Sequence, residues 1–361
     1  MTNLFFPAVL LATLHLFLIG DAGKPRPGGE PVLEALRHEL ERDPAASAVV
    51  FLGDNIYESG LPEPSDPDYD EMARRIGDQV RTVTELGVRG LFLPGNHDWA
   101  GKGQEEWKRV QRQEALVESL GTEFVRWLPD RGCPGPEVID DWNPGLRLIV
   151  LDTQWWLQGN DRPEDAGICP APNDTAVVAA LSNALATAGE RRVIVVAHHP
   201  LATRGAHGGH FTVLDHLVPL RNLRPWLLIP LPVIGSLYPF GRAHGVYRQD
   251  LSASRNKYMR AHLMEAFRSR PPWMYVAGHE HNLQLLDGKA ELGPGAPAHL
   301  VVSGAGVAGH TEPVDRDRTR VASSKAGFFR LDFNDDGTAS LTMFTVSKDG
   351  VASEAWRGPV E

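Results

Sequence analysis

Five short polar motifs, each placed directly after an apolar run, contain the side chains of this sequence that are best suited to bind metal ions. They combine carboxylate, phenol, amide and imidazole groups and contain no thiol. Such oxygen- and nitrogen-rich donors suit iron, manganese or zinc. A single GD or GNH turn arises easily by chance, whereas five motifs in series are a strong signal. In chain order they are GDAG at 20–23, GDNIY at 53–57, GNHD at 95–98, VVAH at 195–198 and GHEH at 278–281.

The order of these motifs resembles that of the calcineurin-like metallophosphoesterases, and within them the purple acid phosphatases. The resemblance extends over about residues 14–282. Its most specific detail is a pair of linked residue changes in the first and second motifs. Most of the superfamily has an Asp-x-His first motif, whereas Gly23 stands here where that His would be, and Tyr57 follows three residues after Asp54. The purple acid phosphatases make the same exchange, and their Tyr is a ligand of iron(III).

The resemblance implies a site for two metal ions, one of them Fe(III) and the other a divalent Fe, Zn or Mn. Two ions need a shared ligand that holds them close together. In an extended GHEH segment, residues two apart point the same way, so His279 and His281 can serve different ions while Glu280 faces away. Taken singly, each residue also has a structural alternative, such as helix capping or core packing. The predicted ligands are Asp21, Tyr57 and His281 for the first ion, Asn96, His198 and His279 for the second, and Asp54 for both.

The expected chemistry is an in-line attack on phosphorus by a metal-bound hydroxide, with a nearby acid for the leaving alkoxide. His97 adjoins the predicted ligand Asn96 and is the expected acid. His207 lies nine residues after His198, an offset at which mammalian-type purple acid phosphatases also carry a histidine. We expect His207 to bind phosphate and to help protonate the leaving group. Its alternative is a solvated loop histidine.

Other polar and aromatic residues near the motifs, among them His199, are lesser candidates. We expect Asp98 to orient His97 or to cap the following helix. Arg204 is either a substrate contact or a solvated loop residue. Trp155 and Trp156 either wall the cleft or, more commonly for such a pair, pack in the core.

Strand-like apolar runs alternate with amphipathic helical patterns over most of the chain. The run 14–19, for example, is followed by a helical pattern over 31–42 with Pro near its first turn. This βα alternation predicts an α/β fold with a largely parallel sheet and covering helices. The runs 299–303, 327–333 and 339–346 are separated by turn residues, and we expect them to form a second, antiparallel sheet.

The family resemblance turns this pattern into a specific architecture, a four-layer αββα sandwich in which two stacked mixed sheets are flanked by helices. We predict a single domain over residues 1–361. It carries a long insertion at about residues 201–249 and an antiparallel carboxyl-terminal strand region at about 297–350. Prolines 225, 230 and 232 disfavour a helix in part of the insertion, which is either a packed surface loop or an apolar rim that touches substrate or membrane.

The amino-terminal residues leave the location of the protein open. Residues 4–19 are largely apolar, yet no Lys or Arg precedes Lys24, so a complete signal peptide is not recognisable. This run leads straight into Asp21, so cleavage after it would destroy the predicted metal site. We interpret 14–19 as a core strand and 4–11 as another strand, or as the remnant of an export or anchor segment. A periplasmic, extracytoplasmic or membrane-associated location is compatible with this pattern.

Charge and cysteine content restrict the partners. The net charge of -10 argues against binding a nucleic-acid backbone, although a small phosphorylated substrate remains compatible because metals and histidines set the local potential. The two cysteines, Cys133 and Cys169, form no CxxC pair. They are either free thiols or one disulfide, which would stabilise the fold by ~3–4 kcal/mol.

Together these observations predict a metallophosphatase that hydrolyses phosphate monoesters. One alternative keeps the metals but cleaves phosphodiesters such as nucleotide derivatives. Another is a non-catalytic protein that binds metal or phosphate. A third is a membrane-associated interaction module, suggested by the apolar amino terminus and the proline-rich insertion, for which membrane contact through the segment 225–240 is expected. The sequence does not define the oligomeric state.

Overall fold

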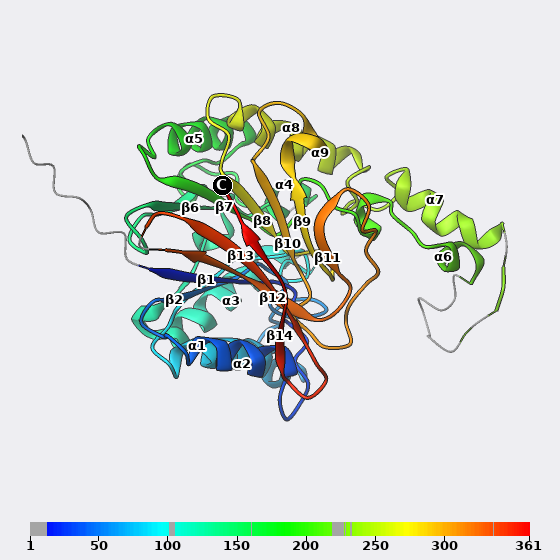
Figure 1. The fold of residues 1–361 in the computed structure, drawn as a ribbon, viewed down its shortest axis with the longest axis horizontal. Coiled ribbons are helices and arrows are strands. Elements are labelled where there is room, and N and C mark those ends of the chain that lie inside the picture. Colours follow the sequence, from blue (N-terminus) through cyan, green and yellow to red (C-terminus); the bar gives the residue numbers. More distant parts are fainter. Residues whose placement is uncertain are drawn as a thin grey trace, which may run out of the picture.

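Two mixed β-sheets lie face to face at the centre of the molecule, and helices cover both outer faces (Figure 1). The computed structural model describes residues 13–100, 105–159, 161–218, 227, 229–231, 233–334 and 336–361. Within these residues each sheet has seven strands. The predicted αββα sandwich of the α/β class is confirmed.

The first sheet joins the strands of the first three motifs to the carboxyl-terminal strands of the chain. In spatial order its strands are β14 (Ala352–Pro359), β13 (Ala339–Val346), β12 (Gly327–Phe333), β1 (Leu14–Ile19), β2 (Ser47–Phe51), β3 (Arg89–Phe92) and β4 (Val125–Trp127). The strands β1 to β4 are parallel, whereas β12 pairs antiparallel with β1 and starts an antiparallel meander. The first three motifs follow β1, β2 and β3, so they lie together beyond the carboxyl ends of these strands.

The second sheet carries the last two motifs. In spatial order its strands are β11 (Thr319–Ser323), β9 (Leu283–Asp287), β10 (His299–Ser303), β8 (Met274–Ala277), β7 (Arg192–Val196), β6 (Leu146–Val150) and β5 (Glu137–Ile139). The central strands β6, β7, β8 and β10 are parallel to one another. The two outer strand pairs, β11 with β9 and β5 with β6, are antiparallel.

The helices divide between the two outer faces. On the first sheet lie α1 (Pro31–Leu40), α2 (Tyr69–Thr84) and α3 (Glu106–Gly121), and on the second lie α4 (Gln154–Leu157), α5 (Asp174–Ala186) and α8 (Ser254–Phe267). A short helix, α9 (Gly288–Leu292), follows β9. The 3₁₀ turns η1 (Thr122–Phe124) and η2 (Asp130–Gly132) flank β4.

Alternating side chains along the strands separate two buried apolar layers. In β1, Leu16 and Leu18 belong to the layer between the sheets, whereas Phe17 and Ile19 belong to the layer beneath the helices. This alternation follows from the two-residue period of a strand. The layer between the sheets is formed by side chains from strands of both, so one continuous core fixes the two motif-bearing sheets against each other.

The carboxyl-terminal strands are distributed differently from our prediction. We expected residues 299–303, 327–333 and 339–346 to form one antiparallel second sheet, and this is wrong. Strands β12 and β13 extend the first sheet beyond β1, while β10 lies between β8 and β9. Without β12, the strand β1 would present a row of unpaired backbone groups at a sheet edge. The division into one domain with an insertion stays a prediction.

The insertion contains short helices rather than one regular element. These are η3 (Ala206–Gly208), α6 (Val213–Leu217), η5 (Ile234–Ser236) and α7 (Leu237–Ala243). Residues 219–226, 228 and 232 of the insertion, and the amino-terminal run 4–11, lie outside the described residues, so our expectations for them stay predictions. Among the helices that the structure describes, none is long and apolar enough to cross a membrane.

Cys133 and Cys169 form a disulfide, which was one of the two alternatives. The bond links the segment after η2 to the loop before α5, across 36 residues of sequence. Closing a loop of this length stabilises the folded state by ~3–4 kcal/mol in the chain-entropy model.

Candidate metal centre

The five motifs meet where the carboxyl ends of parallel strands from both sheets come together. Asp21 follows β1, Asp54 follows β2, and Asn96 follows β3 in the first sheet. His198 follows β7 and His279 follows β8 in the second. The carboxyl ends of parallel strands are where open α/β sheets hold their ligands. The shared core between the sheets thus brings residues almost 260 positions apart, such as Asp21 and His279, into direct hydrogen-bonding contact.

One group of donors consists of Asp21, Tyr57 and His281. The Tyr57 hydroxyl lies 2.9 Å from Oδ1 of Asp21 and 3.1 Å from Nε2 of His281. Nε2 of His281 is 3.5 Å from the same Asp21 oxygen. The other Asp21 oxygen accepts a hydrogen bond from the His279 backbone N–H at 2.8 Å. A carboxylate, a phenol and an imidazole therefore converge on one point.

A second group consists of Asn96, His198 and His279. Oδ1 of Asn96 lies 3.0 Å from Nε2 of His198 and 2.9 Å from Nδ1 of His279, and these two nitrogens are 3.2 Å apart. The other ring nitrogen of His198, Nδ1, donates to the Leu52 carbonyl at 2.8 Å. That bond fixes the tautomer, because a carbonyl can only accept, and it leaves the Nε2 lone pair of neutral His198 facing the group.

Asp54 lies between the two groups. Its Oδ2 is 3.4 Å from Nε2 of His198, and its Oδ1 accepts the backbone N–H of His97 at 2.8 Å. One ligand atom each from Asp21, Asp54 and His198 lies within 4.8 Å of the other two. The structure therefore brings together all seven residues that we predicted as ligands.

Histidines lie beside the buried carboxylates of this centre, and each kind of group shifts the pKa of the other. Burial would raise the pKa of Asp54, but the neighbouring His198 and His97 outweigh it and lower that pKa. Burial would lower the pKa of His198, but the neighbouring Asp54 raises this pKa to about 9. Burial likewise would lower the pKa of His281, but the neighbouring Asp21 raises it to about 9. Burial and the two carboxylates raise the pKa of the Tyr57 phenol. Cations that replaced these protons would satisfy the same carboxylates.

The donor set fits metal ions. Ligand atoms about 2.0–2.3 Å from one cation lie about 3 Å from one another, which is the spacing of the donors in both groups. In the second group, His198 Nε2 and His279 Nδ1 face the Asn96 amide oxygen and also face each other. A cation bound by all three atoms would satisfy them better than hydrogen bonds among them do. Asp21, Asp54, Tyr57, Asn96, His198, His279 and His281 are the residues that would hold such ions.

The backbone at three of these positions adopts the left-handed conformation. The φ angles of Asp21, Asp54 and His279 are 59°, 54° and 70°. Non-glycine residues seldom adopt such angles, at a cost of about 1–3 kcal/mol each. Strain of this kind gathers at sites where the orientation of a side chain matters more than stability.

Gly23 explains why a tyrosine serves this site. A Cβ atom at position 23 would lie 2.4–2.5 Å from backbone atoms of residues 54–56. The Gly23 N–H also donates to the Asp54 carbonyl, and the Tyr57 N–H donates to the Gly23 carbonyl. With the two loops packed this closely, no side chain fits at position 23. The Tyr57 hydroxyl, brought in by the second loop, contacts Asp21 and His281 instead.

His97 lies at the mouth of the centre. Its Nδ1 donates to the Glu58 carbonyl at 2.7 Å, and its ring lies 4.5 Å from the Tyr57 ring. The bond to a carbonyl requires a proton on Nδ1, which leaves Nε2 as the ring nitrogen without this partner. His97 lines the same cavity as Asp54 and Asn96.

His207 is held against the second donor group by residues of the insertion. Its ring lies 4.0 Å from the His279 ring, and its backbone N–H donates to Oε1 of Glu280 at 2.7 Å. Nδ1 of His207 lies 2.9 Å from Oδ1 of Asp250 and 2.9 Å from a nitrogen of Arg242. Arg242 and Asp250 are themselves an ion pair at 2.6 Å. His207 is thus half-buried at the cleft.

The lesser candidates serve other purposes. Asp98 accepts backbone N–H groups of Gly95, Asn55 and Ile56 at 2.7–3.1 Å, so it fixes the loop that carries Asp54 and Tyr57. We had expected it to orient His97 or cap a helix. Arg204 forms an ion pair with Glu291. Trp155 and Trp156 are buried in the core.

The sequence did not identify the insertion residues that line the cleft. A cavity of about 740 Å³ covers the centre, and Tyr238, Arg242, Tyr247 and Arg248 form one wall of it. The ring of His310, which lines a separate cavity together with His281, lies 4.2 Å from the His281 ring. No local pattern marks these residues, because their position depends on how the insertion folds back over strands that are distant in sequence.

The family of the chain follows from comparison with known proteins. Residues 14–227 match the family model described as calcineurin-like phosphoesterase, which covers more than half of the chain. The chain therefore belongs to the calcineurin-like phosphoesterases.

Two curated relatives from Arabidopsis thaliana are purple acid phosphatases. Purple acid phosphatase 17 is 23% identical over 221 residues, which cover 59% of this chain and 60% of that protein. Purple acid phosphatase 3 is 24% identical over 226 residues, which cover 60% of this chain and 56% of that protein. The chain thus spans less than two thirds of the length of these relatives. The predicted resemblance to the purple acid phosphatase subgroup is confirmed, and it supports a metallophosphatase.

A solved structure shows the same fold. It is described as GAP50, the anchor in the inner membrane complex of Plasmodium, and it is 15% identical to this chain. The alignment covers 97% of this chain and 89% of that one, with a TM-score of 0.56. At this identity the likeness extends to the fold alone.

Proposed function

We propose that this chain is a metallophosphatase that hydrolyses phosphate monoesters at a site for two metal ions. The observation that carries the proposal is the arrangement of Asp54 between two separate donor groups. Asp21, Tyr57 and His281 form one group, and Asn96, His198 and His279 form the other. Each group alone has the number and type of donors that one hard or borderline cation requires.

Two bound cations would activate water and withdraw charge from the phosphate oxygens. The residues of the chain would provide the remaining functions. With Nδ1 committed to the Glu58 carbonyl, protonated His97 has its Nε2–H available to donate to the leaving oxygen. A leaving alkoxide needs such a proton because it is a strong base. His207, fixed by Asp250 and Arg242, would donate to a phosphate oxygen or share in this proton transfer.

The preference for monoesters and the identity of the metals rest on similarity. The matched relatives are named purple acid phosphatases. Tyr57 supports Fe(III) in the first group, because a phenolate is a hard, strongly donating ligand. We propose a divalent Fe, Zn or Mn as the second ion.

The test combines metal analysis of the purified protein with a substrate panel. We expect two metal ions per chain, and turnover of an aryl phosphate monoester that a chelator abolishes and added metal restores. Faster turnover of a diester, such as bis-(4-nitrophenyl) phosphate, would replace the proposal by a phosphodiesterase. Two bound ions without turnover of either ester would indicate a binding protein, and a single ion per chain would overturn the binuclear site.

A further inference from the structure

The insertion forms an arm that stands away from the sandwich. We define the insertion arm as residues 211–218 and 233–247, which include α6, η5 and α7. In Figure 1, α6 and α7 lie at one end of the molecule, well outside the layers of sheets and helices. These elements contact one another, and α7 also contacts η3 beside the cleft. The arm is therefore an extension of the wall that covers the metal centre.

The surface of the arm is apolar to an extent seen nowhere else in the described part of the chain. The described part of the chain has 16 exposed large apolar or aromatic side chains, and 10 of them belong to the insertion arm. Val233 is 81% exposed and Val213 is 74% exposed. Scattered apolar side chains are normal on a protein surface, whereas a contiguous group of them marks an interaction site. The most exposed on the two helices and η5 are Val213, Leu214, Ile234, Leu237 and Phe240.

The described residues of the insertion arm, which ends at residue 247, carry no exposed carboxylate, ammonium or guanidinium group. The charged residues of the insertion arm are Asp215 and Arg242, and both are buried. Asp215 closes a capping box with Thr212, and Arg242 is paired with Asp250. A surface that binds another protein usually has a polar, charged rim around its apolar centre. The described arm exposes polar side chains such as Thr212 and His244 but no charged ones.

We propose that the insertion arm docks on a lipid bilayer, with its exposed apolar side chains inserted at the level of the headgroups. Amphipathic helices that present aliphatic and aromatic side chains bind membranes in this manner without spanning them. The charge of the segment agrees with phosphate-bearing headgroups. Besides the paired Arg242 and the buried Asp215, the charged residues of the sequence 211–247 are Arg221 and Arg224, in a chain whose net charge is -10.

Docking through the arm would also orient the cleft. Tyr238, Val246 and Tyr247 are exposed on the arm and line the cavity above the metal centre. The mouth of the cavity would therefore lie at the bilayer surface. This orientation does not depend on which phosphoester the centre takes, so the docking proposal and the proposed function can fail separately.

The test is co-sedimentation of the full chain with sucrose-loaded vesicles of phosphatidylcholine, and of phosphatidylcholine with phosphatidylglycerol. We expect the wild-type protein to bind both. The double variant Leu237→Glu, Phe240→Glu should lower the partition coefficient at least tenfold, because it places two charges on the apolar surface. Val351→Glu is the matched control, since Val351 is 60% exposed in the turn between β13 and β14, and it should bind as the wild type does. Circular dichroism and metal content would show that each variant is folded.

Three outcomes would overturn the proposal. Equal binding by the double variant would assign membrane contact to another segment, such as the apolar amino terminus. Binding that requires phosphatidylglycerol and disappears at 1 M salt, where the Debye length is about 3 Å, would indicate a purely electrostatic contact. Absence of vesicle binding, with a wild-type dimer in sedimentation velocity that the double variant converts to a monomer, would make the arm a contact between copies of this chain.

Discussion

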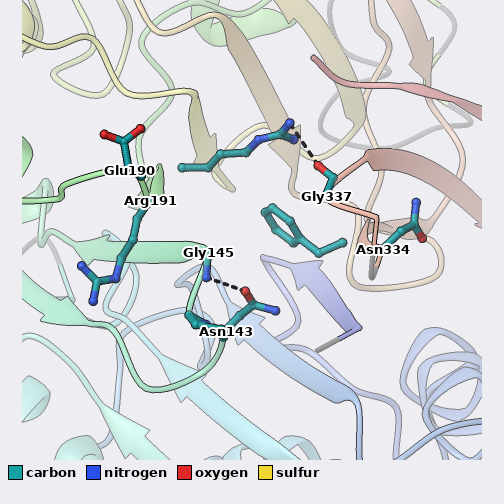
Figure 2. A pocket seen from close by; sticks show the side chains of 9 residues that line it. Asn143, Gly145, Glu190, Arg191, Asn334 and Gly337 are labelled. Carbon is teal, nitrogen blue, oxygen red and sulfur yellow. Dashed lines mark hydrogen bonds between the residues drawn. The ribbon is translucent and has the colours of Figure 1, made fainter. Parts of the chain in front are cut away.

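Two cavities of similar size lie at opposite ends of the strands, and only one of them is built for chemistry. The cleft at the carboxyl ends has a volume of about 740 Å³. A second pocket, of about 550 Å³, lies at the amino ends of β6 and β7 and beside the β12–β13 turn. Figure 2 shows the loop of Asn143 and Gly145 and the turn of Asn334 and Gly337 on two sides of it.

The polar groups of the second pocket serve local structure rather than converging on one point. Asn143 Oδ1 accepts the Gly145 N–H at 2.8 Å, as in a loop that closes on itself. Arg192 lies over the Trp273 ring at 4.7 Å and donates to the Gly337 carbonyl at 3.4 Å. In the cleft, by contrast, buried carboxylates and imidazoles face one another and the backbone is strained at three donor positions. Convergence of such donors, rather than volume, identifies the functional site.

Removing the carboxylate that joins the two donor groups should have the largest effect. Asp54→Ala deletes the proposed shared ligand and the acceptor for the His97 N–H, so we expect loss of bound metal and a fall of turnover to background. Metal analysis and a monoester assay would measure both. The fold should persist, because the core between the sheets is untouched. Two tightly bound ions in this variant would contradict the role of Asp54 and weaken the contrast between the cavities.

His97→Ala should lower turnover by ~10²–10⁴, the range for loss of a general acid. Metal content should stay unchanged, since His97 belongs to neither donor group. The loss should shrink for substrates with good leaving groups, which need less protonation, and a series of aryl phosphates would measure this. An equal loss for all leaving groups would assign His97 to phosphate binding instead.

Asp98→Asn tests whether the ordered loop matters for the metal centre. The Asp98 carboxylate accepts the N–H groups of Gly95, Asn55 and Ile56, and an amide offers only one oxygen for them. Residues that hold metal ligands in place typically contribute 10–100-fold to affinity or activity, so we expect a loss of about that size in metal affinity. Competition with a chelator of known affinity would measure it. Unchanged affinity would show that the loop holds its shape without Asp98.

The ligand residues of the cleft could be predicted from the sequence because each of them belongs to a short local motif. Six of the seven ligands lie within four residues of a strand end, and Tyr57 lies six residues after β2. The period of each strand and the spacing of each motif are readable within a short window. Strand β1 and helix α1 begin where predicted, at Leu14 and Pro31. The family resemblance then predicts how the strands that carry the motifs are arranged. That arrangement brings Asp21 and His279 together.

The sequence failed where the outcome depends on distant partners. Which sheet β10 and β12 join is decided by which strand edge is open, and their own residues do not encode it. Arg242 and Asp250 meet His207 only because the insertion folds back over the second sheet. The loop role of Asp98 was likewise invisible, since its hydrogen-bond partners include residues more than 40 positions away.

Tyr57→Phe would sharpen the identity of the first donor group at little cost to activity. A phenolate bound to Fe(III) gives a charge-transfer band in the visible, so the oxidised wild-type protein should be coloured and the variant colourless. We expect turnover to stay within about tenfold, because Asp21, Asp54 and His281 would still hold the ion. A visible spectrum and an iron assay would measure this. Colourless iron-loaded wild-type protein would contradict phenolate ligation.

The smallest effect should come from the second pocket, where Asn334→Ala is the matched control. Asn334 Nδ2 donates to the Thr338 hydroxyl at 2.8 Å across the β12–β13 turn. Loss of this hydrogen bond should lower the free energy of unfolding by about 0.5–1.5 kcal/mol. Metal content and kcat/KM should equal those of the wild type, because the pocket lies at the opposite ends of the strands from the metal centre. Chemical denaturation and steady-state kinetics would measure both quantities. A tenfold fall in kcat/KM at unchanged stability would mean that the amino-end pocket also takes part in function, and convergence of donors would no longer be enough to tell the two cavities apart.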